Sequence, residues 1–183
     1  MHPARLWRHK QGQTVQCRLC SHYCKLEPDE YGKCGVRANQ DGSLMTLAYD
    51  TVAAMNVDPI EKKPLYHFLP GTQSFSIGTM GCNLACEFCQ NDTLSQYPKK
   101  THRVQGEQVT PDQIVTAAQR YQTASISYTY SEPTIFFELI QDTAALAQAR
   151  GLKNILVTNG FMSPECLKEL GSLVDAANVD LKA

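Results

Sequence analysis

Three cysteines that lie close together, Cys82, Cys86 and Cys89, constrain this chain more than any other feature, in a C-x3-C-x2-C pattern. Their thiolates can converge on one inorganic centre only if the backbone curls into a tight loop. Soft sulfur ligands select zinc, copper(I) or an iron–sulfur cluster. Four cysteines would close a structural zinc site or an electron-transfer cluster, whereas three leave one iron of a [4Fe-4S] cube without a protein ligand. The pattern therefore predicts a metal centre with one position open for chemistry.

A second group of four cysteines precedes this loop: Cys17, Cys20, Cys24 and Cys34. Four thiolates at this spacing can bind one tetrahedral ion. Zinc is favoured because no position would stay open, and a second iron–sulfur cluster and four unmetallated thiols are the alternatives. His22 lies inside the group and could replace a cysteine, although a role outside the metal ligands, or exposure to solvent, is the preferred interpretation.

The second half of the chain alternates strands with helices. Strands are predicted over residues 74–79, 124–130, 154–159 and 177–182, and helices over 111–122, 133–150 and from 163 onward. Thr110 begins a capping box, Ser163 begins another capped helix, and Gly151 ends the helix between them. Such alternation predicts an α/β fold with a parallel sheet and right-handed crossovers, with functional residues at the carboxyl ends of the strands.

Three segments are expected along the chain. Residues 1–43 form an N-terminal four-cysteine metal-binding module, 44–73 a connector with short strands, and 74–183 a (β/α) domain. Residues 58–71 contain three prolines, so this run is predicted to be irregular. Lys62, Lys63 and His67 within it could line an approach to the active site, but simple solvation is the preferred interpretation.

Composition excludes several classes of protein. The net charge is -1 over 183 residues and the sequence pI is about 6.5, so no basic field is present and nucleic acid is not an expected partner. The basic opening residues are followed by Gln11-Gly12-Gln13 instead of an apolar run, which does not fit a secretory signal. No stretch approaches the ~18 apolar residues of a membrane span. A cytoplasmic protein in a reducing compartment is expected.

With Phe88 between two cysteines, the loop reads C-x3-C-x-aromatic-C, which resembles the signature of radical S-adenosylmethionine enzymes. Residues 58–71, 90–91, 128–134 and 180–182 resemble the AmmeMemoRadiSam branch, relatives of pyruvate formate-lyase activating enzyme. The resemblance extends from Cys17 to Lys182. It implies a partial (β/α)6 barrel from which about two β–α units are missing, and hence a truncated fragment with an unpaired sheet edge.

The same resemblance implies cofactors and partners. A [4Fe-4S] cluster on Cys82, Cys86 and Cys89 would bind S-adenosylmethionine through its free iron and cleave it reductively. The 5′-deoxyadenosyl radical would then abstract hydrogen from an unknown substrate, with a protein glycyl residue as one option. A flavodoxin-like or ferredoxin-like electron donor and Memo-like partner proteins are further implications.

The resemblance also implies a set of cofactor-binding residues: Phe88, Asn91, Glu132, Thr158, Asn159, Asp180 and Lys182. Phe88 would pack on the adenine or shield the cluster from water, Asn91 would bind the cofactor or form a plain turn, and Glu132 would accept from the cofactor's amino group or act as a helix N-terminal carboxylate. Tyr130 and Ser131 replace two glycines of the family pattern.

Other residues have less specific expectations. Val157 stands where the activating enzymes carry an aspartate. Tyr128 and Tyr130 share a strand face and would line the pocket or pack, and Cys166 is expected to be a small core residue. Two other functions remain open, namely a non-catalytic zinc or iron–sulfur module and a ferredoxin-like electron carrier.

Overall fold

The structure is a computed structural model that describes residues 1–182. At its centre is a five-stranded sheet in the order β13-β12-β11-β9-β8. Its strands are β8 (Ala54–Pro59), β9 (Gln73–Gly78), β11 (Ser125–Tyr128), β12 (Lys153–Thr158) and β13 (Ala176–Val179). The last four are parallel, and β8 pairs antiparallel with β9 at one edge. The predicted α/β fold with a parallel sheet is therefore confirmed.

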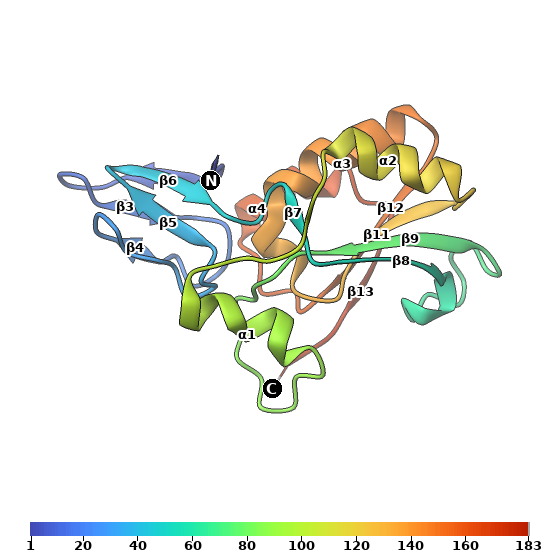
Figure 1. Cartoon of the computed structure of the whole chain (residues 1–183), viewed down its shortest axis with the longest axis horizontal. Coiled ribbons are helices and arrows are strands. Elements are labelled where there is room, and N and C mark those ends of the chain that lie inside the picture. The colour runs from blue at the N-terminus through green and yellow to red at the C-terminus, as the bar shows by residue number, and fades with distance from the viewer. Residues whose placement is uncertain (183) are drawn as a thin grey trace.

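Helices follow the strands of this sheet. They are α1 (Asp92–Thr101), α2 (Pro111–Arg120), α3 (Phe137–Ala149) and α4 (Pro164–Gly171), with short 3-10 turns η1 (Ile60–Lys62) and η2 (Pro133–Phe136). Helices α2 and α3 lie together along one face of the sheet, and α1 lies on the opposite side (Figure 1). Side chains such as Ile126, Phe136 and Leu139 are fully buried between helices and sheet. Within residues 1–182, no helix combines the length and apolarity needed to cross a membrane.

The local helix signals read from the sequence are present. Thr110 Oγ1 accepts from Gln113 N at 3.2 Å, and Thr110 N donates to Gln113 Oε1 at 2.8 Å, which completes the predicted capping box. Ser163 Oγ accepts from Cys166 N at 3.1 Å at the start of α4. Helix α3 ends just before Gly151, whose φ is +78°. The predicted helix from residue 133 begins instead as η2, and α3 starts at Phe137.

The N-terminal residues form a lobe of short strands beside the main sheet (Figure 1). One small sheet has the order β1-β6-β5 and another the order β2-β3-β4. Their strands are β1 (His2–Pro3), β2 (Trp7–His9), β3 (Val15–Cys17), β4 (Lys25–Leu26), β5 (Arg37–Gln40) and β6 (Ser43–Thr46). β7 (Thr51–Val52) pairs with β10 (Glu107–Gln108) between the lobe and the main sheet.

Two parts of the fold differ from the sequence-based expectation. The predicted irregular run is regular only at its start, where β8 extends to Pro59 and pairs with β9 over six residues and η1 follows; residues 63–72 contain no helix or strand, as expected. The sequence of β8, Ala-Met-Asn-Val-Asp-Pro, does not alternate apolar with polar residues, so its strand character was hidden. Helix α1 was not predicted either, and it contains Pro98 in its interior, a residue that ordinarily argues against a helix.

Candidate functional site

One cavity of about 560 Å³ brings the predicted site residues together where the parallel strands end. All ten residues expected to bind the cluster or the cofactor line it: Cys82, Cys86, Phe88, Cys89, Asn91, Glu132, Thr158, Asn159, Asp180 and Lys182. The carboxyl ends of parallel strands meet at one edge of a sheet, so loops distant in sequence converge there. Two other cavities, of about 650 and 700 Å³, have no cysteine in their lining.

The same cavity also reaches the far end of β9. Lys62 and Lys63 line it, and they follow Asp58, which pairs with Ser74 at the start of β9. The cysteine loop follows Gly78, at the end of that strand. At about 3.3 Å per residue, these two ends of the strand lie about 13 Å apart. This is a backbone distance, and the side chains shorten it: Tyr130 bonds to Asp58 through its hydroxyl group and to Asn91 through its carbonyl oxygen, so it lies between the lysines and the cysteine loop.

Polar groups surround the sulfurs of the cysteine loop. Leu84 N donates to Cys82 Sγ at 3.4 Å, and Asn159 Nδ2 lies 3.9 Å from the same sulfur. Ser95 Oγ lies 3.3 Å from Cys89 Sγ. Burial raises the pKa of the Cys82 thiol to about 11. Donors directed at sulfur are what a cluster-bound thiolate requires, since hydrogen bonds to sulfur help to set its electronic properties.

Among the residues that the structure describes, no three Cys, His, Asp or Glu side chains converge on a single ion position. This finding bears differently on the two cysteine groups. A cubane takes one thiolate on each iron, so its ligands need not share one ion. A tetrahedral zinc needs four sulfurs around one point, and the N-terminal thiols do not form that arrangement as they stand.

Glu132 is buried and holds together the ends of two strands. Its Oε1 accepts from Thr134 N, Thr134 Oγ1 and Thr158 Oγ1 at 3.0, 2.6 and 2.6 Å, and its Oε2 accepts from Asn159 N at 2.8 Å. Burial raises the pKa of this carboxyl group, and these donors oppose the shift. Glu132 caps η2, which agrees with the expected role at a helix N-terminus, and two of its four hydrogen bonds also hold Thr158 and Asn159 in place.

Tyr130 adopts the backbone conformation that the missing glycine would allow. Its φ is +67°, in the left-handed region that side chains disfavour. Tyr130 Oη donates to Asp58 Oδ2 at 2.7 Å, and its carbonyl oxygen accepts from Asn91 Nδ2 at 2.8 Å. Tyr128 differs from Tyr130, because it is fully buried and donates to Asn154 Oδ1 at 3.0 Å. Of the two tyrosines, only Tyr130 lines the cavity.

The two lysines line the cavity, a role that the sequence allowed but that was ranked below simple solvation. Lys63 Nζ donates to Asp58 Oδ2 at 2.6 Å with its side chain only 3% exposed, and Lys62 Nζ donates to Asp58 Oδ1 at 2.9 Å. The expectation that both are simply solvated was wrong for Lys63. Its charge is buried because Asp58, at the end of an unpredicted strand, supplies a buried partner.

Four further residues that were predicted to bind the cofactor line the cavity: Phe88, Asn91, Asp180 and Lys182. Asp180 and Lys182 lie beyond the end of β13 and pair with each other at 3.1 Å. Phe88 is 62% exposed, so its ring does not shield the cysteine loop from water, and Lys182 Nζ lies 5.8 Å from its ring centroid. Asn91 is the N-cap residue of α1, but its side chain does not cap the helix.

The four N-terminal cysteines lie near one another beside a buried ion pair. A Cβ built on Gly32 would be 3.8 Å from both Cys24 Sγ and Cys34 Sγ. Burial raises the pKa of Cys20 to about 12, and the three other cysteines of the group add to that shift. Arg37 Nη1 lies 3.6 Å from Cys17 Sγ, and Arg37 also pairs with the buried carboxylate of Glu138 on α3.

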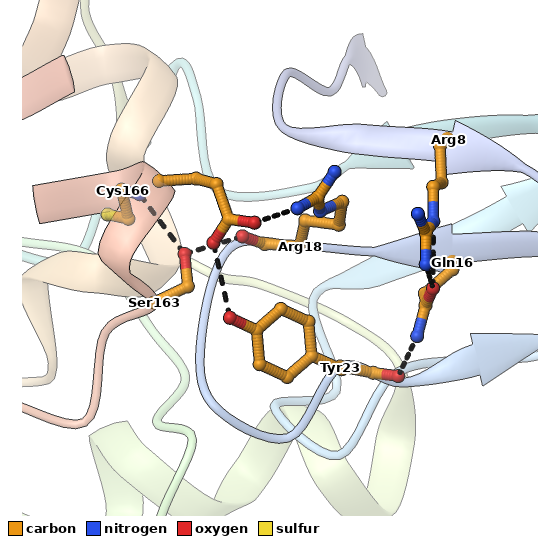
Figure 2. A network of polar contacts seen from close by, with 7 residues as sticks. Arg8, Gln16, Arg18, Tyr23, Ser163 and Cys166 are labelled. Carbon is orange, nitrogen blue, oxygen red and sulfur yellow. Dashed lines mark hydrogen bonds and ion pairs between the residues drawn. The ribbon is translucent and has the colours of Figure 1, made fainter. Parts of the chain in front are cut away.

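The loop that carries Cys20 packs against the turn between β12 and α4 (Figure 2). Ser163 Oγ donates to Arg18 O at 2.6 Å and also caps α4 through Cys166 N. Arg18 pairs with Glu165, and Tyr23 Oη donates to the same carboxylate at 3.2 Å.

This turn directly follows Thr158 and Asn159, so the N-terminal lobe supports one wall of the cavity. His22 contributes by donating from Nε2 to Asn83 O, at 2.8 Å, in the cysteine loop. Cys166 is fully buried, as predicted.

Comparisons with known proteins agree with this site. A family model described as Radical SAM superfamily matches residues 76–183. The uncharacterized protein MJ0808 of Methanocaldococcus jannaschii is 41% identical over 182 residues, which cover 100% of this chain and 54% of that protein. The chain thus spans about half the length of the curated relative it matches. Because the family model matches more than half of the chain, the chain belongs to the radical S-adenosylmethionine superfamily.

Proposed function

We propose that this chain carries the cofactor-binding part of a radical S-adenosylmethionine enzyme, in which Cys82, Cys86 and Cys89 each bind one iron of a [4Fe-4S] cluster. The observation that supports this most is their shared cavity with Thr158 and Asn159 at the ends of the parallel strands. The residues fit the group, because all three ligands are thiols, Leu84 N donates to Cys82 Sγ, and Ser95 Oγ lies 3.3 Å from Cys89 Sγ. When bound, the reduced cluster supplies one electron for cleavage of S-adenosylmethionine and so starts hydrogen abstraction from a substrate.

Glu132 and its partners would orient the cofactor. A carboxylate offers about four acceptor positions, two on each oxygen, and Oε2 of Glu132 has a single protein donor, Asn159 N. We propose that the free position on Oε2 accepts from the amino group of S-adenosylmethionine. Glu132 also fixes Thr158 and Asn159 at the end of β12, so one carboxylate would bind the cofactor and position two of its neighbours.

The finer placement within the superfamily is also a proposal. The segments at 58–71, 128–134 and 180–182 support membership of the AmmeMemoRadiSam branch, and with it a partial (β/α) barrel and Memo-like partners. Relationship to pyruvate formate-lyase activating enzyme supports a protein glycyl residue as one candidate substrate. A flavodoxin-like or ferredoxin-like protein would supply the electron.

For the N-terminal lobe we propose a second metal site on Cys17, Cys20, Cys24 and Cys34. Its support is the mutual proximity of the four thiols and the room that Gly32 leaves between two of them. A zinc ion would require the side chains to rotate toward one point, since no single-ion site is formed within residues 1–182. A second iron–sulfur cluster is the alternative.

Anaerobic reconstitution with iron and sulfide tests the catalytic proposal. The chain should gain a visible iron–thiolate absorbance and, with a reductant, should convert S-adenosylmethionine to 5′-deoxyadenosine. Cys86→Ala should lose both, whereas Cys166→Ala, which removes a buried thiol of the core, should retain them. A cluster without deoxyadenosine would indicate an electron carrier, and zinc bound in place of iron would indicate a non-catalytic module. Metal and sulfide analysis of a Cys17→Ser, Cys20→Ser variant assigns the N-terminal site.

A further inference from the structure

Within the cavity, the end farther from the cysteines carries an excess of positive charge. Asp58 there accepts from Lys62, Lys63 and the hydroxyl of Tyr130. One carboxylate faces two ammonium groups, so one positive charge remains without a partner in this group. Burial alone would raise the pKa of Asp58, but the three donors lower it well below its usual range, and the carboxylate is ionised at neutral pH.

The other acidic groups of the cavity do not compensate this charge. Glu132 is engaged by Thr134, Thr158 and Asn159, and Asp180 pairs with Lys182. These are the aspartate and glutamate residues that line the cavity. Burial lowers the pKa of Lys63, the Lys62 ammonium contributes in the same direction, and Asp58 opposes both. A negatively charged ligand beside the lysines would relieve this repulsion.

The lysines also retain donors for a ligand. An ammonium group has three N–H donors, and the structure assigns one from Lys62 and one from Lys63 to Asp58. Lys62 is 66% exposed at its side chain, whereas Lys63 is almost fully buried beneath the cavity surface. Elsewhere in the cavity lining, the buried Oγ of Ser131 has no hydrogen-bond partner among residues 1–182.

We propose that Lys62 and Lys63 bind an anionic oxygen group, a carboxylate or phosphate, of the substrate. The inference rests on the proposed function, because it places the substrate in the cavity that would hold the cofactor. Tyr130 lies between the lysines and the cysteine loop: its ring centroid is 5.1 Å from Lys63 Nζ, and its carbonyl oxygen accepts from Asn91 Nδ2. The substrate class is therefore an anion whose charged group is held on the far side of Tyr130 from the cluster ligands.

The test uses two simple probes, sodium malonate and inorganic phosphate, titrated into isotope-labelled chain without a cluster and followed by NMR. At least one probe should bind saturably and shift backbone signals around η1, and the probe that binds more tightly identifies the anion class. Lys62→Gln should weaken binding by about tenfold or more, since it removes a charge-assisted contact. Lys63→Gln should do the same, with its folding checked by circular dichroism.

Two control variants locate the site. Lys168→Gln changes an exposed lysine on α4, and Lys182→Gln changes the lysine at the Asp180 end of the cavity; both should leave probe affinity unchanged. The proposal would be overturned if neither probe bound saturably, or if Lys182→Gln lost binding and Lys62→Gln did not. Displacement of the probe by S-adenosylmethionine in reconstituted protein would also overturn it, because the anion would then occupy the cofactor's own site.

Failure of this inference is distinguishable from failure of the proposed function. Probe binding is measured without a cluster, whereas cluster assembly and deoxyadenosine formation are measured on reconstituted protein. Lys62→Gln should still assemble a cluster and form deoxyadenosine, because the lysine would contact substrate and not cofactor. A variant that lost deoxyadenosine formation would place Lys62 with the cofactor and refute the assignment.

Discussion

A methyl group added at Gly35 should disturb the packing of the N-terminal lobe against α1, the helix that follows the cysteine loop. Gly35 follows Cys34 directly, and its backbone has φ +75°. A Cβ on Gly35 would lie 2.5 Å from both Lys99 N and Pro98 C in α1, below the 3.0 Å that real Cβ contacts respect. Since both atoms belong to the backbone, the lobe or α1 would have to move.

Gly71 provides a matched control for the substitution Gly35→Ala. It has the same φ of +75°, but a Cβ there would meet nothing within 4 Å. Both alanines pay about 1–2 kcal/mol for the left-handed backbone. Gly35→Ala should cost a further 1–3 kcal/mol, approximately, for overpacking against α1. The difference between the variants is therefore expected to be about 1–3 kcal/mol, or about 2–4 °C in Tm for each kcal/mol in a chain of this size.

Urea denaturation followed by circular dichroism measures the difference between Gly35→Ala and Gly71→Ala. Iron and sulfide content after reconstitution provides a second readout, because α1 begins three residues after the last cysteine of the loop. Equal losses in the free energy of unfolding would refute the reasoning, because the close approach of Gly35 to α1 would then not contribute to stability.

Three other changes test buried charges and hydroxyl groups. Arg37→Met should destabilise the fold by about 3–5 kcal/mol in urea, because Glu138 would be left as a buried charge without its partner, and adding Glu138→Leu should recover most of the loss. The pKa of Asp58 is lower in the folded state than in the unfolded state, so the ionised carboxylate stabilises the fold. This contribution is complete above the unfolded-state pKa of about 4 and is lost as the pH falls through the lower folded-state pKa. Asp58→Asn should therefore show a smaller fall in Tm on acidification than the natural chain; an unchanged fall would contradict this assignment. Tyr130→Phe removes a hydroxyl bonded to that carboxylate and should cost about 1–2 kcal/mol in urea denaturation, and a cost near zero would show that this bond is not maintained in solution.

The sequence predicted the elements whose signals are local. The capping box at Thr110, the cap at Ser163 and the helix stop at Gly151 involve neighbouring residues, and each is present in the structure. The convergence of distant site residues was also predictable, because parallel strands that alternate with helices bring their carboxyl ends to one edge. Residues as far apart as Cys82 and Asp180 therefore line one cavity.

The lysine end of the cavity could not be predicted, because it depends on partners that no local pattern identifies. In the sequence, Lys63 is typical of an exposed charge in a loop. In the structure, β8 places Asp58 beside it and the two side chains pair. Tyr130 was predicted to be an ordinary strand residue. Its hydroxyl group donates to the same Asp58, which lies far away in sequence. Its left-handed backbone contradicts local preference, and the bonds to Asp58 and Asn91 hold the residue in this conformation.

Two separate sets of contacts connect the N-terminal cysteine group with the cysteine loop. On one side, Gly35 packs against α1, and Lys99 of that helix donates to Leu84 O in the cysteine loop at 2.7 Å. On the other side, His22 donates to Asn83 O of the same loop. Both contacts reach the backbone between Cys82 and Cys86. We therefore expect loss of metal from the N-terminal thiols to lower the iron content of the cluster site, and reconstitution of the Cys17→Ser, Cys20→Ser variant measures this coupling.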